Sequence, residues 1–169
     1  MDTKTKIKKT LQELQFDFTN FTMTNFLQTV RQTRGREIIT IPWETPSNIF
    51  GAWVSDDQEA KEYIFYRNNV PEIHQIHIQL HELSHFLLGH PTRQINKKTL
   101  TEVAMRKVSL PFEELDTLRS SARAYMEAEA ESLASLIQKQ AILHSRLDLL
   151  IRDISAEEKL ASFLKNMGV

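Results

Sequence analysis

The chain has 169 residues, of which 41% are hydrophobic and 25% are charged, and its formal net charge at pH 7 is −1. These values are typical of a single globular domain, and the near-neutral balance gives no general case for nucleic-acid binding. The chain has no Cys, which excludes disulfides and thiolate metal ligands and favours a cytoplasmic location, and no apolar run approaches the length of a membrane span.

Two helices are predicted in the first 35 residues. The first covers residues 4–14, and the second covers residues 24–34 with Gly35 after its end. Three strands follow at residues 37–41, 50–54 and 63–66, and a polar turn at 56–59 joins the last two as a hairpin. The sequence therefore predicts an α+β fold, with a small, about three-stranded sheet packed on several helices.

We expect one domain over residues 1–169, with N-terminal helices at 1–35, a core at 36–141 and a C-terminal helical tail at 142–169. An amphipathic stretch at residues 99–108 could form part of a cleft wall. In the tail, Ser155 has the features of an N-cap, with Glu158 three residues later. The tail either packs against the domain or meets a partner.

The most informative segment is a helix predicted to begin near Pro71 and to end before Gly89. Its residues 81–85 read H-E-L-S-H. Histidines four residues apart lie on one face of a helix, where both can bind one metal ion, and the glutamate between them can reach a water molecule at that metal. The pattern predicts His81 and His85 as metal ligands and Glu82 as the catalytic base.

A second predicted helix, over residues 122–140, carries a candidate third ligand. Glu129 falls within its apolar stripe, between Tyr125 and Leu133, whereas Glu127 and Glu131 fall on its polar side. A carboxylate that faces a core needs a partner, which can be a metal ion or an arginine. Because catalytic zinc usually has three protein ligands, we expect Glu129 to complete the set.

Two further histidines lie close to the motif. His90 could be a third ligand, as in zinc peptidases that use three histidines, but on a continuing helix it would point away from the metal. We interpret it as a residue at the helix end. His77 lies one turn before His81 on the same face, where it could line a cleft or bind a second ion; the simpler interpretation is a polar residue at the solvated edge.

Together the two motifs resemble the ImmA/IrrE family of metallo-endopeptidases, which typically read H-E-L-x-H-x-x-x-G-H and later E-x-E-A-x-x-F-A. Here they read H-E-L-S-H-F-L-L-G-H at residues 81–90 and E-A-E-A-E-S-L-A at 127–134. The resemblance covers roughly residues 36–137, with Leu133 replacing the usual Phe and without the Leu-Met-Pro segment that often follows. It implies a minimal zincin-like domain in which His81, His85 and Glu129 bind zinc and Glu82 is the base.

The predicted function is a zinc-dependent endopeptidase, although two histidines and a carboxylate also suit Mn²⁺ or Fe²⁺. The resemblance implies a protein substrate, such as a helix-turn-helix repressor of a mobile element or stress response. No direct binding to nucleic acid or membrane is expected, and an edge strand can pair with an extended substrate peptide. The alternative is a non-catalytic, metal-containing protein that binds a repressor or toxin; a chance motif would give no stoichiometric zinc.

Overall fold

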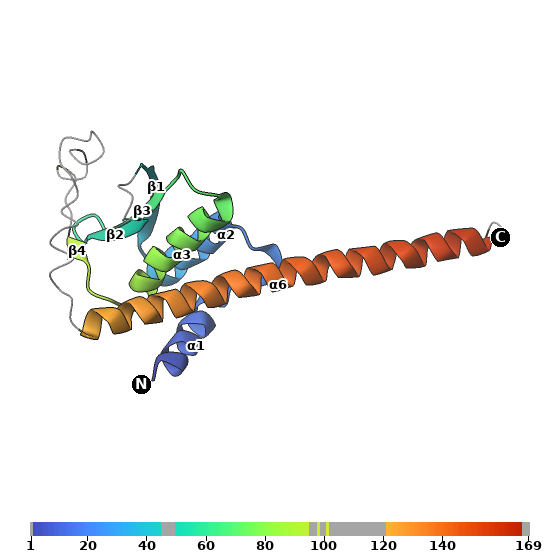
Figure 1. The fold of residues 1–169 in the computed structure, drawn as a ribbon, viewed down its shortest axis with the longest axis horizontal. Coiled ribbons are helices and arrows are strands. Elements are labelled where there is room, and N and C mark those ends of the chain that lie inside the picture. Colours follow the sequence, from blue (N-terminus) through green and yellow to red (C-terminus); the bar gives the residue numbers. More distant parts are fainter. Residues whose placement is uncertain (1, 45–49, 95–97, 99–100, 102–120, 167–169) are drawn as a thin grey trace.

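The structure, a computed structural model, describes residues 2–44, 50–94, 98, 101 and 121–166. Its elements follow in the order α1 (Thr3–Leu14), η1 (Phe18–Asn20), α2 (Met23–Arg34), β1 (Glu37–Trp43), β2 (Gly51–Asp56), β3 (Lys61–Arg67), α3 (Glu72–Leu87), β4 (Arg93–Gln94) and α6 (Ser121–Asn166). A small mixed sheet beside helices confirms the predicted α+β fold (Figure 1). None of the described helices is long and apolar enough to cross a membrane.

Local capping residues set the ends of the short helices. Asp2 and Thr22 cap α1 and α2, and each accepts a hydrogen bond from the backbone N–H three residues later. Gly35 ends α2 with φ 65°, and Gly89 follows α3 with φ 67°, a left-handed conformation that glycine adopts without steric cost. These ends agree with the predicted helices to within a residue or two.

The sheet has the strand order β1-β3-β2-β4. The predicted hairpin is confirmed, because β2 and β3 pair antiparallel, and β1 pairs parallel with β3 on the other side. Strand β1 runs past Pro42, where the sequence predicts its end, and includes Trp43. A proline is tolerated there because β1 is an edge strand, on which the missing N–H need not remove a ladder hydrogen bond.

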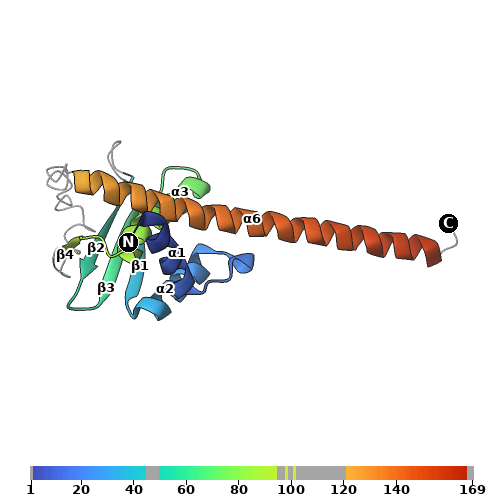
Figure 2. The same ribbon diagram turned by 90° about the horizontal axis from the view of Figure 1, so that it is seen from below.

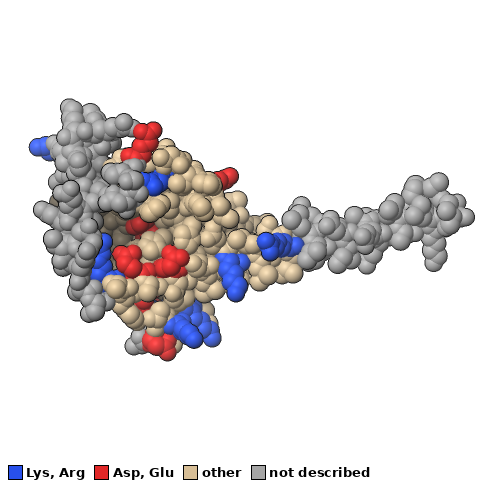
Figure 3. Space-filling view, in the orientation of Figure 1, with Lys and Arg blue, Asp and Glu red and all other residues tan. Residues whose placement is uncertain are grey.

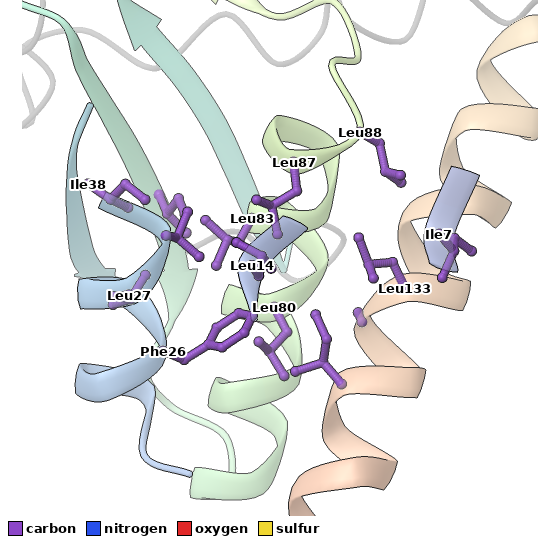
Figure 4. Packing of buried hydrophobic residues seen from close by; sticks show 14 residues of the cluster. Ile7, Leu14, Phe26, Leu27, Ile38, Leu80, Leu83, Leu87, Leu88 and Leu133 are labelled. Atoms are coloured by element: carbon purple, nitrogen blue, oxygen red, sulfur yellow. The ribbon is translucent and has the colours of Figure 1, made fainter. Parts of the chain in front are cut away.

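Helix α3 lies between the sheet and α6, and it carries the centre of the core (Figures 1 and 2). Leu80 and Leu83 of α3 and Leu133 of α6 are fully buried. Figure 4 shows Leu133 reaching from α6 toward α3, with Ile7 of α1 beside it. A second apolar cluster occupies the opposite face of the sheet and comprises Ala52, Val54, Tyr63 and Phe65. The core thus fixes α3 against β2, β3 and α6.

Helix α6 is one continuous element of 46 residues that runs across residue 142. One expectation about the tail needs correction, because Ser155 lies inside this helix instead of capping a new one. The physical reason is that no Gly or Pro interrupts residues 121–166. The ring of His144 stacks on Phe18, and beyond this point the helix extends away from the other described elements (Figures 1 and 2). The stretch predicted at 99–108 lies, apart from Thr101, outside the described residues.

We expect Leu133→Ala to lower the free energy of unfolding by about 2–5 kcal/mol, because it leaves a cavity where α6 packs on α3. The matched control is Leu143→Ala on the same helix. Leu143 is 48% exposed, and its truncation should cost less than about 0.5 kcal/mol. Urea denaturation followed by circular dichroism measures both values. Equal effects would contradict the packing described here.

Candidate metal centre

The two motif histidines lie side by side on the face of α3 that meets α6. Their Nε2 atoms are 3.2 Å apart, and the ring centroids are separated by 5.0 Å. The spacing of four residues produces this arrangement, since one helical turn places the second imidazole beside the first. The structure therefore brings His81 and His85 together as the sequence predicts.

The third group at this point is Glu127 of α6, not Glu129. Its Oε2 lies 3.2 Å from His81 Nε2 and 3.5 Å from His85 Nε2. Ligands held at about 2.0–2.1 Å from a tetrahedral zinc ion are separated from one another by about 3.3–3.4 Å. The three distances match that value closely. His81, His85 and Glu127 thus form a donor set that fits zinc.

Glu129 occupies the opposite edge of the buried face of α6, so its expected role as a ligand of the same ion is not supported. Its carboxylate accepts hydrogen bonds from Lys6 Nζ at 2.9 Å and from Thr3 Oγ1 at 3.1 Å, both on α1. It is only 3% exposed, as the apolar stripe predicts. The partner that burial requires is a lysine of α1, which covers this side of α6.

The buried stripe of α6 is rotated from the one that the sequence predicts. The fully buried residues of α6 include the small Ala130 and Ala134, which let α6 approach α3 closely. The buried stripe is therefore centred on these residues, whereas Tyr125 is 52% exposed. Glu127 lies at one edge of the stripe, beside the histidines, and keeps 46% of its side chain exposed.

Glu131 and His77 extend the same contact between α3 and α6. Glu131 Oε2 accepts hydrogen bonds from His81 Nδ1 and from His77 Nε2, both at 3.2 Å, and His77 Nδ1 contacts Gln138 Oε1 at 2.9 Å. Helices α3 and α6 are antiparallel, so polar residues that follow one another at one-turn intervals along α3 contact such residues of α6 in the reverse order. His77 thus lies outside the three-residue set, and Glu131 holds the ring of His81 by its other nitrogen, an arrangement common among metal-binding histidines.

His90 lies beside His85, but on its far side from Glu127. The chain turns back at Gly89, and the N–H of His90 donates to the carbonyl of His85 at 3.0 Å. His90 Nδ1 is then 2.9 Å from His85 Nδ1, and His90 Nε2 is 3.2 Å from Glu129 Oε2. Burial lowers the pKa of His90, which favours its neutral form. His90 is therefore a helix-end residue, as predicted, with a partner that the sequence did not indicate.

The electrostatics of the site favour a positive charge between α3 and α6. Burial lowers the pKa of His81, but its hydrogen bond to Glu127 and the charge of Glu82 outweigh burial and raise it. Hydrogen bonds from His81 and His85 hold the pKa of Glu127 well below its ordinary value. Figure 3 shows acidic side chains gathered on the face that carries α3 and the first turns of α6. A cation is the natural occupant of such a site.

Glu82 faces the sheet and lies close to the other three side chains. It accepts a hydrogen bond from the Trp53 N–H on β2. Burial raises the pKa of Glu82, although the charges of His81 and His85 act in the opposite direction. The carbonyl of Trp53 accepts from Thr92 Oγ1 at 2.7 Å, so both main-chain groups of this residue are engaged. A peptide pairing with β2 at this point would have to displace them.

Gly51 leaves the space that Glu82 occupies. A Cβ at this position would lie 2.7 Å from Ile78 Cγ2 and 2.9 Å from Glu82 Oε1. We expect Gly51→Ala to lower the free energy of unfolding by about 1–3 kcal/mol through overpacking, without loss of zinc, because the three donor atoms lie on other elements. Thermal unfolding and metal analysis of the same samples test both parts. Unchanged stability would contradict the close contact between β2 and α3.

No protein-family model, curated protein or solved structure was found to match this chain.

Proposed function

We propose that this protein is a zinc-dependent endopeptidase. The observation that carries the proposal is the triangle of His81, His85 and Glu127, whose donor atoms are separated by 3.2–3.5 Å, with Glu82 beside it. Two imidazoles and one carboxylate are the ligand set of many catalytic zinc sites. The same set accommodates Mn²⁺ or Fe²⁺, so the metal is part of the proposal.

Each residue has a distinct part in peptide hydrolysis. Bound zinc would supply a Lewis acid for the scissile carbonyl and would lower the pKa of a water molecule to about 7. His81, His85 and Glu127 would hold the ion. The Glu82 carboxylate takes a proton from the attacking water and delivers it to the departing amine nitrogen. The C–N bond breaks, and peptide and water thereby yield a carboxylate and a protonated amine.

The number of ligands favours catalysis over a structural metal. A structural zinc usually has four protein ligands, and the described residues provide three around this point. The two nearest additional histidines bond elsewhere: His90 meets the remote nitrogen of His85, and His77 meets Glu131 and Gln138. This arrangement supports an enzyme rather than the alternative of a non-catalytic protein that binds a repressor or toxin.

The substrate is proposed to be a protein. Its class, a helix-turn-helix repressor of a mobile element or stress response, comes only from the resemblance of the two motifs. The decisive experiment incubates the zinc-loaded protein with an extract of its source cells and labels the new N-termini for mass spectrometry. Cleavages that need both zinc and Glu82 would support the proposal and identify the substrate. Identical N-termini with wild type and Glu82→Gln would overturn it.

A further inference from the structure

His85 uses both ring nitrogens, and the second one leads away from the metal centre. Its Nε2 faces His81 and Glu127, whereas its Nδ1 lies 2.9 Å from Nδ1 of His90. From there His90 Nε2 reaches Glu129 Oε2 at 3.2 Å. The three side chains form a continuous line, in which His90 is 7% exposed and Glu129 is 3% exposed. Water therefore has little access to either of them.

The positions of the ring protons of His85 and His90 follow from the proposed role of His85 as a metal ligand. An imidazole that binds a metal through Nε2 carries its proton on Nδ1. His85 must then donate to His90, so Nδ1 of His90 is the acceptor and its proton lies on Nε2. That proton is donated to Glu129. In this arrangement each contact in the line has one donor and one acceptor. The orientation of His85 is therefore coupled to the carboxylate of Glu129 through two successive hydrogen bonds.

Helix α1 holds the far end of this line. Lys6 Nζ lies 2.9 Å from Glu129 Oε2, and Thr3 donates to Oε1 at 3.1 Å. The ammonium group of Lys6 thus forms an ion pair with this carboxylate. The carboxylate is thus a buried anion fixed between α1 and His90. A buried ion pair adds little stability compared with well-packed apolar residues in its place, so the packing of α6 does not account for a carboxylate at this position.

We propose that Glu129 and His90 are positioning residues that orient the imidazole of His85 for metal binding, and that α1 keeps Glu129 in place. This inference rests on the proposed metal site. It gives the site two supports of different kinds: Glu131 bonds His81 directly and is half exposed, whereas Glu129 acts on His85 through His90 and is buried. Partners of this kind typically change metal affinity about 10–100-fold.

A double-mutant cycle tests the inference with Zn²⁺ alone as the probe. Glu129→Gln removes the charge, and His90→Asn keeps an acceptor for His85 Nδ1 but no longer reaches Glu129. We expect Glu129→Gln to weaken zinc binding about tenfold or more in the wild-type background and to have no further effect beside His90→Asn. Competition with a chromophoric chelator gives the affinities, and urea unfolding in the presence of EDTA gives the stability of each metal-free protein.

The outcomes separate the inference from the proposed function. If the wild-type protein binds no stoichiometric zinc, both fall. If it binds zinc and Glu129→Gln binds equally tightly, only the inference falls. An equal loss in both backgrounds would mean that Glu129 acts on the fold rather than through His90, and would also overturn it. The predicted non-additivity is a result that a merely structural role would not give.

The contribution of α1 is tested by a matched pair of lysines on the same helix. Lys6→Met removes the cation beside Glu129, whereas Lys9→Met removes an exposed lysine whose nearest acid, Glu13, is 4.0 Å away. We expect Lys6→Met to weaken zinc binding several-fold and Lys9→Met to leave it unchanged. This pair leaves the centre itself intact, so it remains informative if a variant of Glu129 does not fold. Equal affinities for the two variants would overturn the role of α1.

Discussion

Glu82→Gln is expected to keep stoichiometric zinc and to lose peptide hydrolysis. The amide has nearly the shape of the carboxylate but cannot accept the proton of the attacking water, so kcat should fall by about 10²–10⁴-fold. Zinc content should not change, because the three donor atoms belong to His81, His85 and Glu127. Metal analysis and the rate of appearance of new N-termini measure the two effects on the same preparation.

The control for this variant is Glu72→Gln, at the exposed start of the same helix. It removes the same charge from α3 and should leave both zinc content and rate unchanged. Unfolding curves show whether Glu82→Gln is folded; it should be at least as stable as the wild type, because it removes a partly buried carboxylate whose pKa is raised by burial. Full activity of Glu82→Gln would refute the proposed mechanism.

Glu127→Ala is expected to lose stoichiometric zinc. The change removes one of three donor atoms and leaves two imidazoles, so the affinity should drop by more than the about 10–100-fold typical of residues that only support a ligand. Dialysis against metal-free buffer followed by metal analysis should find wild-type protein with one zinc per chain and the variant with none. Its fold should persist, since Glu127 is half exposed and outside the core.

Comparison with Glu129→Ala makes this experiment decisive. That variant should retain zinc at saturating concentration, with weaker affinity, because Glu129 contacts His90 and α1 rather than Nε2 of His81 or His85. Ser132→Ala, which removes an exposed hydroxyl bonded to its own helix, is the neutral control. Loss of zinc in Glu129→Ala together with its retention in Glu127→Ala would restore Glu129 as the ligand and contradict the geometry described here.

A signal for Glu127 was present in the sequence, although no single helix could reveal it. His77, His81 and His85 repeat every four residues on α3, and Glu127 and Glu131 repeat with the same spacing on α6. Two antiparallel helices with matching polar periods can pair those residues in order, and the structure does so. The positions of residues round one helix axis carry no information about a second helix. The pattern of α6 alone therefore predicts Glu129, which has apolar neighbours.

The sequence by itself determined the local features of this protein. Capping residues, glycines and short apolar runs joined by a polar turn define α1, α2, the hairpin and α3, because each depends on neighbours along the chain. The pairing of His81 with His85 belongs to this class, since one helical turn fixes it. The burial of Glu129 was also predictable, because the apolar stripe of α6 is a local pattern.

Only the tertiary structure decided which glutamate meets which histidine. Round the axis of α6, Glu127 and Glu131 lie about 40° apart and Glu129 about 160° from each of them. The packing of Ala130 and Ala134 against α3 decides which of these positions faces the histidines. The return of the chain at Gly89 and the docking of α1 then place His90 and Lys6 on Glu129. These contacts join residues 39 to 123 positions apart, and they depend on the mutual fit of three helices, α1, α3 and α6, which no local pattern encodes.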